Sequence, residues 1–391
     1  MIASRRADER GFDNIQRRSL IVGTVGVVLL IVGALFSLEQ VFRSYLLGYM
    51  FWVGIALGSL AIAALHQLTG GRWGMVMRRL LEAGALTLPV MALLFVPLAF
   101  GLPAIYEWAR PEAVAGDELL QHKQVWLNIP FFLIRTAIYF AVWIVVAYFL
   151  TNWSLELDDL DDPQKARRLR VFSAVGLLLM VLTVTFASYD WLMSLEPHWF
   201  SSIFGAVVGV GFVIAAFTLT IITVVLLADR RPLSEVLSPL IFNDFGSLLL
   251  TFIMIWAYLM LSQFLIIWAA NLPEEVTWYL HRSEGGWQWI GWALALFHFA
   301  LPFVFLLSAT IRQNPRTLAG LAAFVLFMHF VELFWLIKPT FAPEGLRIHW
   351  LDIVALVGLG GVWVALFIWQ LKQRPLVPAP DIVHLREPAE H

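Results

Sequence analysis

Apolar residues occur in ten long runs along this 391-residue chain, and short polar segments separate the runs. The hydrocarbon core of a bilayer is about 30 Å thick, so a helix needs roughly 20 apolar residues to cross it. The runs are apolar on all sides, unlike soluble helices, and do not alternate as barrel strands do. They predict an all-α, polytopic membrane protein with about ten transmembrane helices. The predicted spans are residues 19–37, 45–66, 80–101, 129–150, 171–189, 202–228, 245–271, 289–311, 317–337 and 350–371.

The spans leave room for short tails but for no soluble domain. Two four-helix bundles with flanking helices are the expected packing, although residue identities show no internal repeat. The basic N-terminus resembles the start of a signal peptide, but the run after it is long and lacks a small-residue cleavage site. We therefore expect a retained first span. The Pro-rich C-terminal end is typical of an unfolded or partner-bound segment. The predicted organisation is an N-terminal tail at 1–18, a ten-span domain at 19–371 and a C-terminal tail at 372–391.

The Lys and Arg residues between the runs predict the orientation, because cytoplasmic loops carry an excess of them. Of the 26, nineteen lie in the two tails and one set of alternate loops, six lie in the other set, and Arg135 lies within a span. Both termini are therefore expected in the cytoplasm. The loops around 102–128, 190–201, 272–288 and 338–349 are expected on the outer side.

Composition narrows the classes of function. The chain is 60% hydrophobic and 14% charged, as expected for a membrane protein. It has no Cys, which excludes disulfides, Cys-ligated iron–sulfur clusters and a CxxCH-attached haem in this chain. A metal that carries electrons would belong to another subunit. The basic residues show no pattern typical of nucleic-acid binding.

Polar side chains within the spans are candidates for function, because ionisable groups are costly in the membrane. His298 and His329 lie at similar distances from the outer ends of their spans, and Gln263 falls at a similar depth. Glu332 follows His329 by three residues and so shares its helix face. These residues predict a quinone site or a proton relay in the outer half of the membrane. Separate hydrogen bonds between helices are the alternative.

Arg135 lies about six residues into its span. It is expected either to extend toward the outer surface or to be the counter-charge of a quinone headgroup or a buried acid. Two histidines at equal depth are also typical of haem ligands, but a cytochrome b would normally need two such pairs. We therefore favour a proton path and expect no metal site. Pro302 has no backbone N–H, so it cannot donate the helical hydrogen bond to the carbonyl of His298. That carbonyl is then a further hydrogen-bond acceptor beside the imidazole.

Further candidates lie at the two edges of the membrane. On the outer side, Phe186–Gly205 contains Asp190, Glu196 and His198 but no Lys or Arg. Together with Glu274, Glu275 and His281 of a second outer loop, they are candidates for a proton exit or for docking of a partner. On the cytoplasmic side His66 and Glu82 are candidates for a proton path, or are simply interfacial.

Two of these segments also carry a family resemblance. SLEPHWFSSIFG, which ends at Gly205, and the segment from Asn243 to Trp287 resemble a membrane subunit of bacterial alternative complex III. The resemblance is to the second of its two NrfD-like (polysulfide-reductase-like) membrane subunits, labelled quinone-binding subunit 2, and covers nearly the whole chain. It implies a multi-pass subunit of the bacterial cytoplasmic membrane in a quinol:electron-acceptor oxidoreductase.

The resemblance also implies partners and cofactors. The partners would be a paralogous ten-span subunit, a peripheral iron–sulfur/molybdopterin-like subunit, haem c subunits and membrane lipid, with no nucleic acid. Iron–sulfur clusters and haem c would lie in those partners, and this chain would bind no cofactor covalently. Menaquinol or ubiquinol would be oxidised, and a quinone is a candidate ligand of this chain. A proton-conducting subunit, a stand-alone secondary transporter and a purely structural anchor remain open as alternatives.

Overall fold

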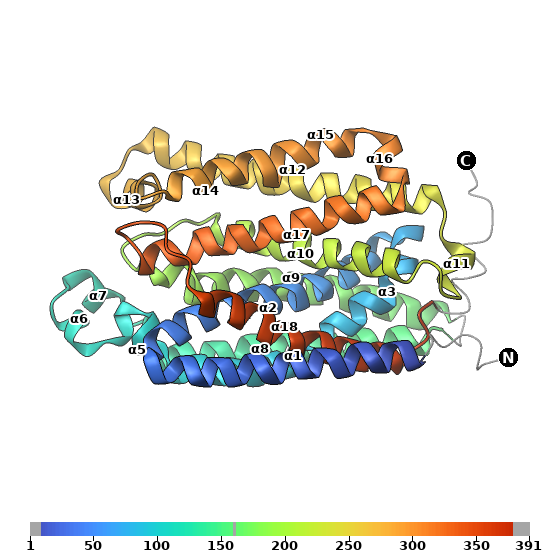
Figure 1. The fold of residues 1–391 in the computed structure, drawn as a ribbon, viewed down its shortest axis with the longest axis horizontal. Helices are drawn as coiled ribbons and strands as arrows, with labels where there is room; N and C mark the ends of the chain where they lie inside the picture. The colour runs from blue at the N-terminus through green and yellow to red at the C-terminus, as the bar shows by residue number, and fades with distance from the viewer. Residues whose placement is uncertain (1–8, 159–161, 378–391) are drawn as a thin grey trace.

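The computed structural model describes residues 9–158 and 162–377 and is built from helices, with no strand in those two ranges. Ten helical segments are long and apolar enough to cross a membrane, which confirms the predicted all-α, polytopic class. Figure 1 shows them side by side. They are α1 (Glu9–Phe36), α2 (Leu38–Thr69), α3 (Arg72–Ala85) with α4 (Leu88–Phe100), α8 (Ile129–Glu156), α9 (Pro163–Trp191), α10 (Phe204–Leu226), α12 (Pro239–Ala270), α14 (Trp287–Ala293) with η4 (Leu294–Ala300) and α15 (Leu301–Leu307), α17 (Pro315–Ile337) and α18 (Trp350–Lys372).

Short helices make up much of the connections between the spans. In chain order they are α5 (Leu102–Ile105), η2 (Glu107–Ala109), α6 (Pro111–Ala115), α7 (Glu118–Lys123), η3 (Met193–Leu195), α11 (Leu233–Val236), α13 (Pro273–His281), α16 (Ala309–Gln313) and η5 (Lys338–Phe341). Helix α1 begins inside the segment predicted as a tail. Residues 1–8 and 378–391 of the predicted tails lie outside the described residues.

The spans pack as two bundles. Helices α2, α3–α4, α8 and α9 pack on one another, and so do α10, α12, the α14–η4–α15 span and α17. Helix α2 joins the two by packing along α10, and its most apolar stretch is 89% buried. Helices α1 and α18 form a flanking pair, as the sequence predicted. They approach closely where Gly26 meets Gly358, since a Cβ on Gly26 would lie 2.3 Å from the Gly358 Cα.

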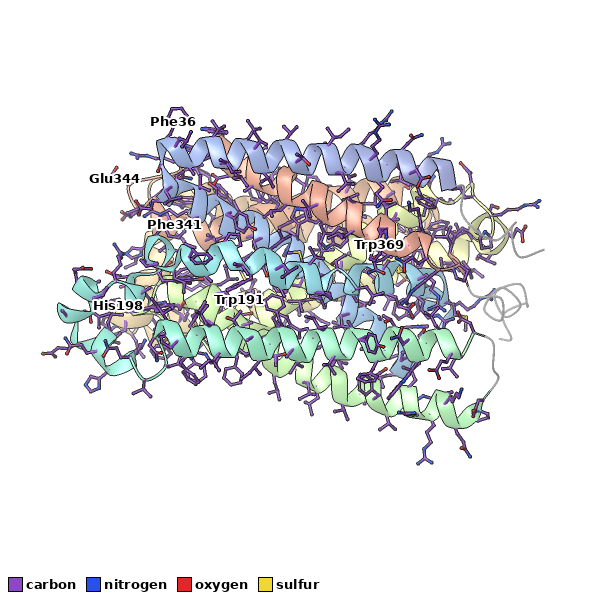
Figure 2. All side chains as sticks on the ribbon, turned by 90° about the horizontal axis from the view of Figure 1, so that it is seen from below. Phe36, Trp191, His198, Phe341, Glu344 and Trp369 are labelled. Atoms are coloured by element: carbon purple, nitrogen blue, oxygen red, sulfur yellow. The ribbon has the colours of Figure 1, made fainter. Side chains whose placement is uncertain are left out.

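The connections gather at the two ends of the bundle. Helices α5, α6, α7 and α13 lie at one end, and α11 and α16 lie at the other (Figure 1). Figure 2 places Phe36, His198, Phe341 and Glu344 at the first of these ends, whereas Trp191 lies in the interior of the protein. We call the end with α6, α7 and α13 the outer end and the opposite one the inner end, following the prediction from loop charges.

Two spans depart from a continuous α-helix. The third is interrupted between α3 and α4, and Pro89 lies in the first turn of α4. In the eighth, seven residues from Leu294 to Ala300 form a π-helix. Pro302, four residues after His298, cannot donate the hydrogen bond that an α-helix would need there. A π-helical turn often marks a functional position in a helix.

Candidate functional site

The second bundle contains a histidine–carboxylate pair in its interior. His329 and Glu332 lie one turn apart on α17, and each side chain is only 1% exposed. The Nδ1 of His329 lies 2.9 Å from Oε2 of Glu332. The spacing that predicted a shared helix face therefore brings the two groups into direct hydrogen-bond contact. An isolated carboxylate at this depth would be costly, and the imidazole partner lowers that cost.

Trp256 of α12 joins this pair to the other histidine. Its indole N–H donates to Oε1 of Glu332 at 2.5 Å, so both carboxylate oxygens accept a hydrogen bond. Its ring stacks on the imidazole of His298, with 4.3 Å between the ring centroids. We refer to Trp256, His298, His329 and Glu332 as the relay cluster. His298, His329 and Glu332 were predicted from the sequence, but Trp256 was not, because a tryptophan in a span is usually a packing residue.

The relay cluster contains polar atoms that no protein group satisfies. Nδ1 and Nε2 of His298 and Nε2 of His329 are buried and have no hydrogen-bond partner among the described residues. The backbone of Met328 is close to the His298 ring but outside hydrogen-bond geometry. Buried polar atoms without a partner are rare and costly, and they occur where a ligand, a water molecule or a proton is exchanged.

Helix α10 closes the relay cluster on one side. Gly211 faces the pair, since a Cβ there would lie 3.0 Å from Cε1 of His329 and 3.3 Å from Oε2 of Glu332. A larger residue would have to displace the imidazole. The ring of Phe212, the next residue, lies edge-on to His329 at 6.4 Å between centroids, and Phe51 of α2 lies at 6.0 Å. Apolar rings thus hold the imidazole within the protein.

Gln263 is engaged elsewhere. It lies seven residues beyond Trp256 on α12, about 10 Å further toward the outer end. Its Oε1 accepts a hydrogen bond from Ser201 at 2.9 Å, and its Nε2 donates to the Tyr279 hydroxyl at 3.3 Å. It links the stretch before α10 to α13, and the structure gives it no direct contact with the relay cluster.

Arg135 belongs to a separate site in the first bundle. Its Nε and Nη2 donate to the two oxygens of Asp190 at 2.8 and 2.7 Å, and Nη1 donates to the carbonyl of Trp126 at 2.9 Å. Asp190 is 0% exposed and also accepts hydrogen bonds from Tyr139 and Trp126 at 2.8 and 3.0 Å. Arg135 is thus the counter-charge of a buried acid, one of the roles expected for it. Its guanidinium is buried and also lies over the rings of Trp126 and Phe131, on the side of Arg135 that faces the outer end.

The acids of Phe186–Gly205 have basic partners from other parts of the chain. Asp190 pairs with Arg135, and Oε1 of Glu196 forms an ion pair with Nη2 of Arg282 at 2.8 Å. The stretch itself contains no Lys or Arg, but packing brings these two basic residues to its acids. Asp190 is too deeply buried and too well paired to serve as an open proton exit.

Glu196 organises the outer loops. Burial opposes ionisation of this carboxyl, but Arg282 and His281 outweigh that effect and lower its pKa. The hydrogen bond to Glu196 in turn raises the pKa of His281. Arg282 is buried beneath α13 and also donates to the carbonyls of Trp335 and Leu336 at 3.2 and 3.0 Å. These bonds fasten the 186–205 stretch to α13 and to the end of α17.

The remaining outer candidates are more exposed. His198 is half-exposed, and its Nε2 lies 2.7 Å from Oδ2 of Asp117, the N-cap residue of α7. Glu274 is exposed on α13. Glu275 is partly buried and lines a small recess of about 150 Å³ together with Ser201 and Gln263. The structure therefore spreads these acids over the outer surface and does not gather them into one group.

At the inner end, Glu82 lies in a buried ionic network. It is 0% exposed and pairs with Arg79 on its own helix and with Arg374, whose Nη1 lies 3.2 Å from Oε2. Arg79 also pairs with Asp158, while Oε1 of Glu82 is buried and has no hydrogen-bond partner in the part of the chain that the structure describes. His66 is separate: its Nε2 lies 3.2 Å from the carbonyl of Gly71. Both side chains are buried within the protein.

Comparison with known proteins gave no relative for this chain. No family model matches the chain, and a search of curated proteins found no significant match. Within the residues that the structure describes, no group of three or more His, Cys, Asp or Glu side chains is arranged to hold a metal ion.

Proposed function

We propose that this chain is a membrane subunit of a quinol-oxidising complex of the alternative complex III type, and that its relay cluster carries protons. The observation that supports the proposal is the buried His329–Glu332 pair beside imidazole nitrogens that have no hydrogen-bond partner in residues 9–158 and 162–377. The segments 194–205 (SLEPHWFSSIFG) and Asn243–Trp287 resemble a membrane subunit of alternative complex III. This resemblance supports a place for the chain in a quinol-oxidising complex. The membrane would be the bacterial cytoplasmic membrane.

The hydrogen bonds of the relay cluster favour proton transfer over a fixed ion pair. Nδ1 of His329 faces a carboxylate that also accepts from Trp256, which favours the tautomer with a proton on Nδ1. Nε2 is then left as a base that can accept a second proton. Glu332 stabilises the resulting imidazolium, and Trp256 fixes the carboxylate in place. Imidazole is suited to this role because it gains and loses a proton near neutral pH.

In this proposal the electron carriers are in partner subunits. The chain has no Cys for an iron–sulfur cluster or for covalent haem. The proposed partners are the paralogous ten-span subunit, the iron–sulfur/molybdopterin-like subunit and the haem c subunits that the resemblance implies. Quinol oxidation releases protons, and the role we assign to this chain is to accept or pass them within the membrane.

Substitution in the assembled complex tests the proposal. His329→Ala and Glu332→Gln should each lower quinol-linked turnover or proton release by about tenfold or more, because a positioned acid or base contributes about 10²–10⁴ in rate. Assembly should be unchanged. Glu112→Gln is a matched control at an exposed carboxyl outside the relay cluster and outside the proton-exit candidates. Normal turnover and normal proton release in both cluster variants would contradict a relay.

Purification separately tests whether the chain belongs to a complex that contains haem c subunits. In mild detergent the chain should co-migrate with haem c, detected by absorbance of the purified complex. A chain that purifies alone and colourless from membranes containing its partners would contradict membership in such a complex, whatever the relay cluster does.

A further inference from the structure

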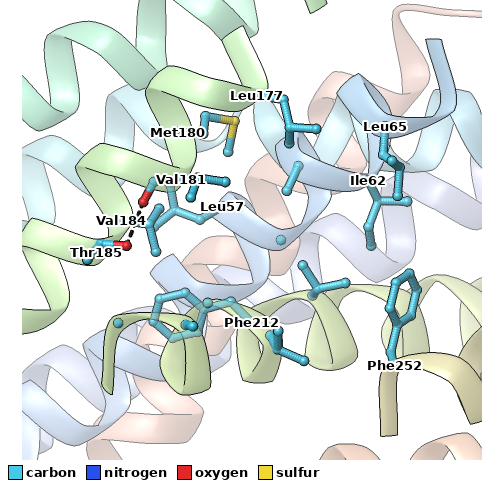
Figure 3. Close-up of a pocket in the computed structure, with 17 residues that line it drawn as sticks. Leu57, Ile62, Leu65, Leu177, Met180, Val181, Val184, Thr185, Phe212 and Phe252 are labelled. Atoms are coloured by element: carbon cyan, nitrogen blue, oxygen red, sulfur yellow. Dashed lines mark hydrogen bonds between the residues drawn. The ribbon is translucent and has the colours of Figure 1, made fainter. Parts of the chain in front are cut away.

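A deep apolar slot opens between three spans of the protein. It has a volume of about 280 Å³ and is lined by α2, α9 and α10, with Phe252 of α12 at one end. Figure 3 shows side chains of α2 and α9 facing those of α10 across it, from Thr185 to Leu65 and Phe252. All of these helices are membrane-spanning segments, so the slot lies at the depth of lipid hydrocarbon.

The lining of the slot offers nothing to a polar ligand. Thr185 carries the only side-chain hydroxyl in it, and that hydroxyl donates to the carbonyl of Val181 at 2.7 Å. A water molecule needs two to four polar partners, and an apolar cavity stays dry. A ring with carbonyl oxygens would likewise lose its hydrogen bonds to water without replacement. The occupant is therefore pure hydrocarbon.

Glycines shape the slot to the width of one chain. Gly205 lets α10 cross close to α9, since a Cβ there would lie 2.8 Å from the Cα of Thr185. Gly209, one turn further, meets nothing closer than Val184 at 3.7 Å, so the two helices have diverged there. Along α10 the slot extends from Gly205 to Val213, about 12 Å at 1.5 Å per residue.

We propose that the slot between α2, α9 and α10 binds one acyl chain of a membrane phospholipid. It begins near the outer ends of α9 and α10 and extends inward, as an acyl chain of the outer leaflet does. Its wall at Phe212 is also the ring that packs edge-on against His329. The bound chain is thus separated from the relay cluster by a single aromatic side chain. This inference does not depend on the redox role.

Photolabelling of the full chain tests the proposal. The protein is placed in vesicles of phosphatidylglycerol that carries a diazirine in the middle of one acyl chain, and the labelled residues are identified by mass spectrometry. Slot residues such as Val210 and Met180 should be labelled more strongly than Val175, which lies on the exposed face of α9. Gly209→Leu, which fills the slot, should reduce slot labelling about tenfold, the factor that roughly two displaced methylene groups carry.

Gly320→Leu is the matched control, because a Cβ at Gly320 of α17 meets nothing within 4 Å and the residue lies outside the slot. It should leave slot labelling unchanged. Slot labelling no stronger than that of Val175, or unaffected by Gly209→Leu in a folded variant, would overturn the proposal. A polyisoprenoid hydrocarbon added at the same concentration as the labelled phospholipid should not remove the label from the slot. Loss of the label would also overturn the proposal, since the slot would then prefer a branched chain to an acyl chain.

Discussion

The two bundles each hold a buried acid beside a basic side chain, and they satisfy it differently. In the first bundle Asp190 accepts four hydrogen bonds, from Arg135, Tyr139 and Trp126, and the guanidinium has further contacts of its own. In the second, Glu332 accepts one bond from His329 and one from Trp256, while three imidazole nitrogens have no partner within the described part of the chain. Both sites contain charged or ionisable groups. They differ in how many of their polar atoms form hydrogen bonds.

This difference distinguishes a structural site from a site that can change its protonation. Two hydrogen bonds join the guanidinium of Arg135 to the carboxylate of Asp190, so this pair is fixed in geometry. It ties α8 to the outer end of α9. Nε2 of His329 and both ring nitrogens of His298 have no hydrogen-bond partner among the described residues, which leaves room there for a water molecule, a ligand or a proton. A partly satisfied polar network inside a membrane is costly, which is why its presence indicates function.

The largest effect on stability is expected at Arg135–Asp190. Asp190→Asn removes the negative charge and leaves Arg135 buried beside a neutral amide, so the free energy of unfolding should fall by about 3–5 kcal/mol. Thermal unfolding of the purified protein in detergent measures the loss. Glu112→Gln, at an exposed carboxyl outside the spans, is the control. A variant as stable as the control would show that this pair does not hold the first bundle together.

Glu332→Gln should have a smaller effect on stability, about 1 kcal/mol or less. The amide can still accept from His329 or from Trp256, so roughly one net hydrogen bond is lost. The same thermal unfolding assay applies. A loss as large as that of Asp190→Asn would mean that both clusters are structural, and the distinction between the bundles would fail.

His298→Phe should change the free energy of unfolding by less than about 1 kcal/mol. The aromatic ring keeps the stack on Trp256, while two buried nitrogen atoms without partners are removed, and removing such atoms does not destabilise a protein. The variant should nevertheless lose proton transfer in the assembled complex. Strong destabilisation would indicate that the imidazole nitrogens have partners and that His298 is a structural residue.

The smallest effect is expected from pH at the outer end. The pKa of Glu196 is lowered, so its contribution is present above its ordinary value of 4.5 and is lost as the pH falls through the lowered pKa. The pKa of His281 is raised, so its contribution is complete below 6.5 and is lost as the pH rises through the raised pKa. Their attraction should thus be strongest between about pH 4.5 and 6.5.

His281→Gln should therefore lower the thermal midpoint slightly in that window and leave it unchanged at alkaline pH. The imidazole is largely exposed, so solvent screening keeps the effect small. His122→Gln, at another exposed histidine of the outer end, serves as the comparison. If the difference in thermal midpoint between the wild type and His281→Gln grew with rising pH, it would contradict a stabilising attraction between a protonated His281 and Glu196.

Much of this organisation could be predicted from the sequence because it depends on local pattern. Ten apolar runs became ten spans, and the i, i+3 spacing of His329 and Glu332 placed them in contact. Pairings between distant parts of the chain could not be predicted. Arg135 meets Asp190 only when α8 packs on α9, and Glu196 meets Arg282 across two loops. Grouping residues by depth therefore placed Gln263 beside histidines that it does not contact.

Infrared difference spectroscopy of the full chain in lipid vesicles tests the central claim most directly. A titration from alkaline to acidic pH should show a proton taken up within the relay cluster, as imidazole bands of His329 with a simultaneous change in the Glu332 carboxyl bands. The account predicts that both signals are lost in Glu332→Gln and persist in Glu112→Gln. A wild-type protein without any Glu332-dependent signal across the titration would show that the relay cluster does not exchange protons.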